Sequence, residues 1–185
     1  MLKRLLLSAL IVFGLSFTAN AQNTQDFDKE NTLFLDLKNG RVVIKMRPDI
    51  APQHVARIKK LTREGFYDGI VFHRVIRGFM AQTGDPTGTG MGGSDYPDLQ
   101  AEFSNELHKR GTLSMARSSS PHSANSQFFI CFKKAAHLDG QYTVWGHVVE
   151  GMEFVDRIKK GSSYNGGKVS NPDKIIKLQI AADVK

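Results

Sequence analysis

The chain has 185 residues, 41% hydrophobic and 23% charged, so it carries enough apolar material for one folded domain and is not a disordered polypeptide. Its formal net charge is +7, but the cations are scattered in short pairs such as Lys59-Lys60 and Lys133-Lys134. This distribution argues against nucleic acid as a partner, because nucleic-acid binding requires a patterned basic stripe or tail.

The first 21 residues have the layout of a secretory signal peptide. A positive start at Lys3 and Arg4 precedes a charge-free apolar run of 13 residues from Leu5 to Phe17. Ala19-Asn20-Ala21 then supplies the small residues of a cleavage site. The apolar run is short for a membrane span, so an uncleaved anchor is the weaker alternative. We therefore expect export without a stable membrane anchor, with a bacterial periplasm as the destination.

Cleavage after Ala21 divides the chain into three parts. These are a signal peptide at 1–21, a flexible N-terminal segment at 22–31 and one folded domain at 32–185. The lone cysteine, Cys131, lies inside the apolar run FFICF and has no partner for an internal disulfide. We expect it to be a buried, inert thiol.

The folded domain begins with a hairpin and a helix. Alternating apolar residues predict strands at 32–37 and 41–46, and Asn39-Gly40 between them is a strong hairpin signal. Pro52 and Gly65 then mark the start and the end of an amphipathic helical stretch.

The rest of the domain is rich in strands. Further strands are predicted at 71–76, 111–115, 127–132, 144–149 and 174–180, with a second short helix at 152–159. The alternation of strand and helix that is typical of a doubly wound parallel sheet is missing. The pattern favours a closed β-barrel with helices over its ends, because closure removes exposed sheet edges.

Three other chemistries are disfavoured. Gly88 to Gly93 match G-x-G-x-x-G, but a second loop follows instead of the helix that a dinucleotide site needs. Serines near His122 lie in a loop without G-x-S-x-G, so a serine hydrolase is not indicated. The six histidines are dispersed, without H-E-x-x-H or a cysteine pair, so no metal is expected.

A different site is indicated by two distant segments. Arg74 stands inside the apolar run VFHRVI, and Gln82 follows shortly after it. In SQFFICF, Gln127 and Phe129 alternate with residues suited to the core. Such a site offers an apolar floor, one fixed cation and two amides, but no nucleophile and no acid–base pair. The reaction it suits breaks no covalent bond.

The stretch FHRVIRGFMAQTGDPTGTGMGG, followed by GTLSMAR, SQFFICF and HLDGQYTVWGHVVEGM, closely resembles the cyclophilin family of peptidyl-prolyl cis-trans isomerases. The resemblance runs from about Thr32 to Ile180. It implies a mainly β fold, a closed eight-stranded antiparallel barrel capped by two α-helices, with a hydrophobic groove on its outer surface. It also implies isomerisation of X-Pro bonds in unfolded or exported polypeptides by a monomer, without a cofactor or metal.

The resemblance also implies roles for individual residues. Arg74 would be catalytic, and Gln82 would hold the neighbouring carbonyl. The implied substrate-binding residues are Phe79, Met80, Gly90, Ala116, Arg117, Gln127, Phe129, His137, Leu138 and Tyr142. A proline-peptide binding module or holdase is the alternative from another class. It would need the apolar pocket but not an arginine aimed at the prolyl nitrogen.

Three positions depart from the commonest family pattern. Arg117, His137 and Tyr142 stand where many members carry asparagine, tryptophan and histidine, respectively. These positions belong to the rim of the groove, so substrate preference is expected to differ. Binding of the inhibitor cyclosporin is expected to be weak.

Overall fold

The computed structural model describes residues 28–185. The predicted signal peptide at 1–21 and residues 22–27 of the predicted N-terminal segment lie outside the described residues. Within the rest of that segment, Lys29–Asn31 forms a short 3-10 helix, η1. No helix in the described part of the chain is long and apolar enough to cross a membrane.

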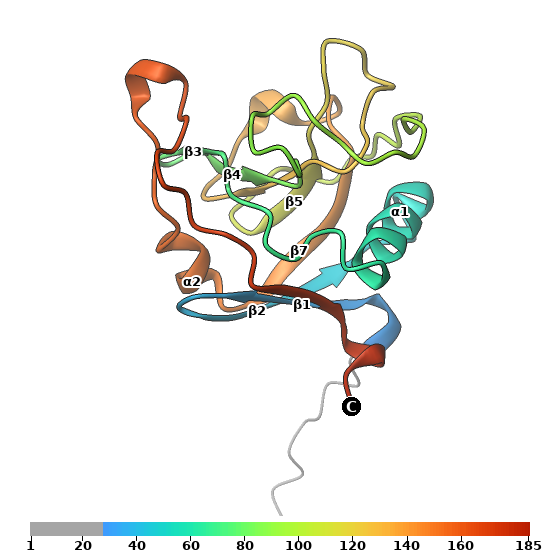
Figure 1. The fold of residues 1–185 in the computed structure, drawn as a ribbon. Helices are drawn as coiled ribbons and strands as arrows, with labels where there is room; N and C mark the ends of the chain where they lie inside the picture. The colour runs from blue at the N-terminus through green and yellow to red at the C-terminus, as the bar shows by residue number, and fades with distance from the viewer. Residues whose placement is uncertain (1–27) are drawn as a thin grey trace, which may run out of the picture.

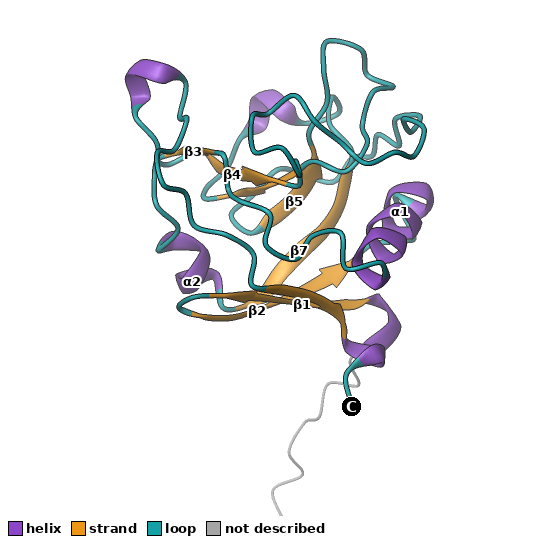
Figure 2. Ribbon diagram, viewed as in Figure 1, coloured by secondary structure: helices purple, strands orange, loops and turns teal. Residues whose placement is uncertain are grey.

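One eight-stranded sheet forms the body of the domain (Figures 1 and 2). Its strands are β1 (Thr32–Leu37), β2 (Gly40–Met46), β3 (Arg74–Ile76), β4 (Met80–Thr83), β5 (Thr112–Met115), β6 (Phe128–Cys131), β7 (Val144–Glu150) and β8 (Lys177–Ile180). The order across the sheet is β3-β4-β6-β5-β7-β2-β1-β8, and every pairing is antiparallel. The mainly β architecture with antiparallel strands is therefore confirmed.

The sheet is an open half-barrel, which corrects the prediction of a closed barrel. The edge strands β3 and β8 do not pair with each other. Residues 161–176, here called the seam segment, cross the gap between them without forming a strand (Figure 1). Several glycines and Pro172 weaken strand formation there. Single backbone hydrogen bonds, such as that from Phe72 N–H to Asp173 O (2.8 Å), connect the seam segment to this side of the domain instead.

The first hairpin forms as predicted, but its turn lies one residue earlier than expected. Leu37 pairs with Gly40, so the two loop residues are Lys38 and Asn39. Gly40 has a φ of +144°, and a Cβ there would lie 2.5 Å from the ring of Phe154. The glycine is therefore needed where the second helix packs on β2.

Helix α1 (Pro52–Arg63) lies against the right-hand side of the sheet in Figure 1. Pro52 occupies the first turn, where its missing N–H is not needed. The preceding residue offers no side-chain cap. The carboxylate of Glu102 replaces it by accepting from the backbone N–H groups of Gln53 (3.0 Å) and His54 (3.1 Å). An anion at this position also suits the helix dipole.

The remaining helices are short. Helix α2 (Met152–Asp156) ends three residues before the predicted limit at 159. Three further 3-10 helices are η2 (Ala136–Leu138), η3 (Ser163–Asn165) and η4 (Ala181–Asp183). In Figure 2, η3 lies at the tip of the loop that projects beyond β3.

Two apolar clusters share the strand β6. Phe128 and Ile130 point into the main core with Trp145, whereas Phe129 and Cys131 belong to a second, smaller cluster. This division follows the alternation of side chains along a strand, as predicted. Cys131 is fully buried, and its burial raises the pKa of the thiol to about 12, which agrees with the expected inert thiol.

Candidate active site

The second apolar cluster contains most of the apolar residues predicted for the site. Met80 and Phe129 come from adjacent strands and Leu138 from η2, and all three are buried. Half-buried Phe79, Ala116 and Tyr142 pack against them. The ring of Tyr142 meets Phe129 edge-on at 5.9 Å between centroids, and the exposed ring of His137 lies 5.3 Å from that of Phe79. The cluster is therefore an apolar surface that is bordered by the rings of Phe79 and Tyr142.

A buried polar group supports this surface from beneath. The ring of His108 stacks on Phe129 at 6.3 Å, with an interplanar angle of 18°. Asp139 accepts from His108 Nδ1 at 2.9 Å, and His108 Nε2 bonds with Ser114 Oγ at 3.0 Å. Burial lowers the pKa of His108 although Asp139 opposes this. These contacts fix the orientation of the Phe129 ring, and the sequence pattern gave no sign of them.

Arg74 begins a chain of polar contacts beside the apolar cluster. The strand register places Arg74 directly opposite Gln82. Arg74 Nη1 donates to Gln82 Oε1 (3.2 Å), and Gln82 Nε2 donates to Gln127 Oε1 (2.9 Å). Gln127 Nε2 donates in turn to the carbonyls of Gly92 (2.8 Å) and Gly90 (3.1 Å). Each amide is thus oriented by its neighbour.

The guanidinium of Arg74 is held on a second side by the seam segment. Arg74 Nε donates to the carbonyl oxygen of Gly166 at 3.0 Å. Within residues 28–185, its Nη2 makes no hydrogen bond. The side chain is therefore fixed in position while it keeps N–H donors for a ligand.

A cleft of about 540 Å³ adjoins the apolar cluster. Its walls include the predicted residues Gln82, Gly90, Ala116, Arg117 and Gln127, together with Met91, Gly92, Gly93, Ser94, Asp98, Ser118, Ser123 and Asn125. Ala116 belongs to both the cleft and the apolar cluster, so the two form one continuous site. The structure thus brings all the predicted site residues together.

The glycine-rich wall of the cleft is built around Asp85. This buried carboxylate accepts from Thr87 N–H (2.8 Å) and Gly90 N–H (2.6 Å). Burial opposes its ionisation, but hydrogen bonds from Thr87 and from backbone N–H groups lower the pKa of Asp85 to about 2. No helix follows this loop, which agrees with the rejection of a dinucleotide site.

Arg117 forms the rim between the cleft and the aromatic side of the cluster. Its guanidinium carbon lies 4.4 Å from the centroid of the Tyr142 ring. Its N–H groups donate to the carbonyls of Gln141 (3.2 and 3.3 Å) and Ser118 (2.9 Å). The serine-rich loop beyond it does not form a triad, because His122 Nδ1 accepts from the backbone N–H of Ala101.

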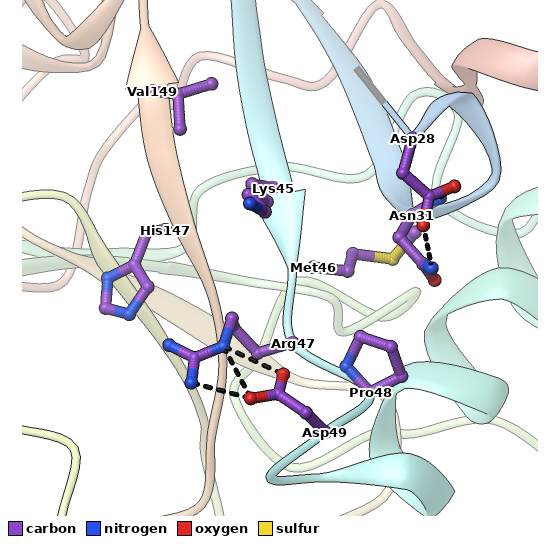
Figure 3. Close-up of a pocket in the computed structure, with 9 residues that line it drawn as sticks. All are labelled: Asp28, Asn31, Lys45, Met46, Arg47, Pro48, Asp49, His147 and Val149. Carbon is purple, nitrogen blue, oxygen red and sulfur yellow. Dashed lines mark hydrogen bonds and ion pairs between the residues drawn. The ribbon is translucent and has the colours of Figure 1, made fainter. Parts of the chain in front are cut away.

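A second hollow, of about 560 Å³, lies on β2 and β7, away from these residues (Figure 3). Arg47 is its most prominent cation, and it donates to Asp49 (2.7 Å) and to Glu106 (3.1 Å). None of the predicted site residues lines this hollow. Since its arginine is already paired, we place the candidate active site at Arg74.

Comparisons with known proteins indicate one family for the whole domain. A family model described as cyclophilin type peptidyl-prolyl cis-trans isomerase/CLD matches residues 16–180. A probable peptidyl-prolyl cis-trans isomerase of Brucella suis is 56% identical over 190 residues, which cover 97% of this chain and 96% of that protein. Peptidyl-prolyl cis-trans isomerase B of Bacillus subtilis is 42% identical, over 69% of this chain and 90% of that protein.

Solved structures show the same likeness. A cyclophilin from Hirschia baltica matches with a TM-score of 0.76 and 27% identity, covering 85% of this chain and 76% of that one. A cyclophilin type isomerase of Cryptosporidium parvum, crystallised in the presence of the dipeptide Ala-Pro, matches with a TM-score of 0.74 and 31% identity. That match covers 80% of this chain and 98% of the other.

Proposed function

The chain belongs to the cyclophilin family of peptidyl-prolyl cis-trans isomerases, and from this premise we propose that Arg74 stabilises the twisted prolyl amide during isomerisation. The activity itself, cis-trans isomerisation of X-Pro peptide bonds, is the activity for which its relatives are named. The observation that supports the role of Arg74 is its geometry. The guanidinium is fixed from two sides next to an apolar surface, and its Nη2 donates to no acceptor among the described residues.

The chemistry follows from the electronic structure of the amide. Resonance gives the X-Pro bond a barrier of about 20 kcal/mol. A twist of about 90° removes this resonance, so the prolyl nitrogen becomes pyramidal and gains a usable lone pair. A guanidinium donor aimed at this lone pair stabilises the twisted state more than either planar state. Neither a nucleophile nor a proton transfer is required.

The other site residues would position the substrate. We assign the proline ring to the apolar surface of Phe79, Met80, Phe129 and Leu138, which excludes water from the reacting bond. Gln82 has one Nε2 hydrogen that is not used in its bond to Gln127, and this hydrogen would hold the neighbouring carbonyl. The carbonyls and side chains of the adjoining cleft would bind the flanking peptide.

We also propose that the enzyme is exported and acts, as a monomer, on polypeptides that fold outside the cytoplasm. The support is the signal-like pattern at 1–21, which lies outside the described residues. The division into 1–21, 22–31 and 32–185 is likewise retained as a prediction.

The test is a prolyl isomerisation assay on a short X-Pro peptide with purified residues 22–185. We expect the rate to rise in proportion to the protein concentration. Peptide binding without acceleration would favour the binding module or holdase. Fractionation of the producing cells with a compartment marker would test export separately.

A further inference from the structure

Four cations lie along the edge of the half-barrel next to Arg74, and we call them the basic edge. They are Arg77, Lys133, Lys160 and Lys168. None of them takes part in an ion pair within residues 28–185. Unpaired charges gathered at one edge produce a local positive potential, in contrast to the scattered charge of the chain as a whole.

Lys168 is the cation of the basic edge that is paired directly with Arg74. It forms an isolated antiparallel bridge with Arg74 across the seam. The hydrogen bonds of this bridge are made by the residues on either side, such as Val169 N–H to His73 O (3.0 Å), and not by the pair itself. In such a pair the two side chains share one face and approach each other most closely. Lys168 is exposed, and the bridge places it next to Arg74 on the same face of the sheet.

Arg77 and Lys133 continue the edge at the turn between β3 and β4. Arg77 is exposed at the start of this turn. The Nζ of Lys133 lies 3.6 Å from the point that a Cβ on Gly78 would occupy, so the ammonium group lies across the turn. Both cations are next to Phe79, because Phe79 ends the turn and its carbonyl accepts from the residue preceding Lys133.

Lys160 completes the edge from the side of α2. Its Nζ lies 4.8 Å from the centroid of the Phe132 ring. Burial lowers the pKa of Lys160, and the nearby charge of Arg77 adds to this effect, whereas the carboxylates of Asp156 and Asp173 oppose it. The two cations are therefore close enough to repel each other.

Asp156 and Asp173 offset the charge of Lys160 in part, but each carboxylate is already held by another cation. Asp156 accepts from both terminal nitrogens of Arg110, at 2.9 and 2.6 Å. Asp173 accepts from Lys38 Nζ at 2.6 Å and from the backbone N–H of Lys159 at 2.8 Å. The positive potential beside the proline-binding surface is thus available to a ligand.

We propose that the basic edge is a subsite for acidic residues that flank the proline, so that the enzyme favours X-Pro segments with Asp or Glu nearby. This inference rests on the proposed function. The basic edge can contact the residues that flank the proline only if the proline ring binds to the apolar cluster next to Phe79. A carboxylate bound beside Arg74 would be attracted by both Arg74 and Lys168. The cations farther along the edge attract acidic chains before contact.

The experiment compares kcat/KM for matched X-Pro peptides whose flank is neutral, acidic or basic, with the charged residues placed either before or after the proline. We expect the acidic-to-neutral ratio to be about three to ten in low salt for at least one placement, because each exposed pair is weak and several act together. The ratio should approach one at about 0.5 M salt, where exposed charges are screened.

Variants identify the residues responsible. The triple variant Arg77→Gln, Lys133→Gln, Lys168→Gln should lower the ratio to the small preference that Lys160 and Arg117 can still support. Lys168→Glu alone should shift the preference toward the basic flank. Lys45→Gln is the matched control, since Lys45 is an exposed lysine that lines the other hollow. It should keep the natural ratio. A ratio of activities is used so that a general loss of turnover cancels.

The outcomes separate this inference from the proposed function. If the natural enzyme isomerises the neutral peptide but shows no acidic preference in low salt, the subsite does not exist. If the acidic-to-neutral ratio is unchanged in the triple variant, the basic edge is not its cause. If no peptide is isomerised at all, the proposed function itself is wrong.

Discussion

Arg74 is held by Gly166 and Gln82, so its loss should affect catalysis without unfolding the domain. We expect Arg74→Ala to lower kcat/KM by about ten- to 160-fold, which corresponds to a charge-assisted hydrogen bond of about 1.5–3 kcal/mol. Arg74→Lys should also be poor, because an ammonium lacks the planar fork that reaches two acceptors and a ligand together. The measurement is peptide isomerisation beside a thermal melt.

Arg157→Ala is a suitable control for Arg74→Ala. Arg157 is an exposed arginine whose guanidinium carbon lies 5.8 Å from the centroid of the Phe154 ring, on the α2 side of the molecule. It should keep full activity. An Arg74→Ala protein with natural turnover and an unchanged melt would rule out the proposed mechanism.

Arg117 offers a second residue-scale prediction. Its guanidinium lies on Tyr142 at the rim of the cleft, so an acidic residue near the proline should be bound slightly better than in Arg117→Asn. A rim pair is worth at most about 1 kcal/mol and should weaken with salt. The comparison is the acidic-to-neutral ratio of kcat/KM in the two proteins. Equal ratios in low salt would show that Arg117 does not contact the acidic flank.

His137 should make the enzyme tolerant of cyclosporin. The resemblance implies this cyclic peptide as a groove ligand, and tryptophan at this position offers it a large apolar face and an N–H donor. Histidine is smaller, and we expect a loss of about 1–3 kcal/mol, or about ten- to a hundred-fold in affinity. His137 is exposed beside Phe79, so small-peptide turnover should change much less.

The cyclosporin prediction is decided by titrating inhibition of the natural enzyme and of His137→Trp. The variant should be inhibited more tightly at similar activity. Inhibition of the natural enzyme already at low nanomolar cyclosporin, or no change in the variant, would show that His137 is not the cause.

The sequence indicated the candidate site residues better than the residues that hold them in place. Arg74, Gln82 and Gln127 were found because polar groups interrupt apolar strands, and the structure joins all three in one chain of bonds. Gly166 and His108 were missed. Gly166 contacts Arg74 and His108 contacts Phe129, and in both cases the two residues are far apart in the sequence. The periodicity of a single segment cannot indicate such a contact.

At the scale of elements, the capping of α1 by Glu102 gives a stability prediction. Glu102→Ala leaves two N–H groups at the start of the helix and the buried ring of His54 without their acceptor. We expect a loss of about 1–3 kcal/mol in the free energy of unfolding, measured by denaturant titration. Glu153→Ala, which removes an exposed glutamate in the first turn of α2, is the control. Equal stability of both variants would contradict this account of the helix start.

Strands with a strong local alternation of apolar residues were predicted well. Short strands that are formed only through pairing with distant strands were not. The strand at Thr32–Leu37 has the predicted bounds, because alternation and the following turn define it locally. The predicted strand at 71–76 is regular only at Arg74–Ile76, and β4 (Met80–Thr83) was not predicted. Both pair with partners that alternation within a single segment cannot identify.

At the scale of the whole molecule, buried histidines predict acid sensitivity. Burial lowers the pKa values of His54, His73, His108 and His147 below the usual value of about 6.5. The unfolded chain therefore binds more protons than the folded one once the pH falls below about 6.5. Stability should be complete above that pH and should decrease as the pH falls toward the folded-state values.

Thermal melts between pH 8 and pH 5 would test this. His73 is the most telling of the four, since both of its ring nitrogens are buried without a hydrogen bond among the described residues. We expect the melting temperature to fall across the acidic half of this range. A melting temperature that is constant down to pH 5 would mean that these rings are not kept neutral by the fold.

The overall class of the fold was predictable, but its closure was not. Many alternating segments and few helices indicate an antiparallel β architecture from composition and pattern alone. Whether the sheet closes between its edge strands β3 and β8 depends on whether residues 161–176 pair as a strand. The structure joins them to residues 69–75 by single bonds and isolated bridges, such as that of Val71 with Lys174.

The bond from Arg74 to Gly166 has a consequence for how such an enzyme can diverge. Gly166 belongs to a surface loop that contributes no strand and only a short 3-10 helix. Insertions and deletions are tolerated best in such loops, since few core contacts depend on their length. Insertion or deletion of one or two residues in this loop would move the Gly166 carbonyl and so reorient the Arg74 guanidinium, while the packing of the core stayed the same. Given the proposed role of Arg74, such a change would alter catalytic efficiency with little effect on thermal stability.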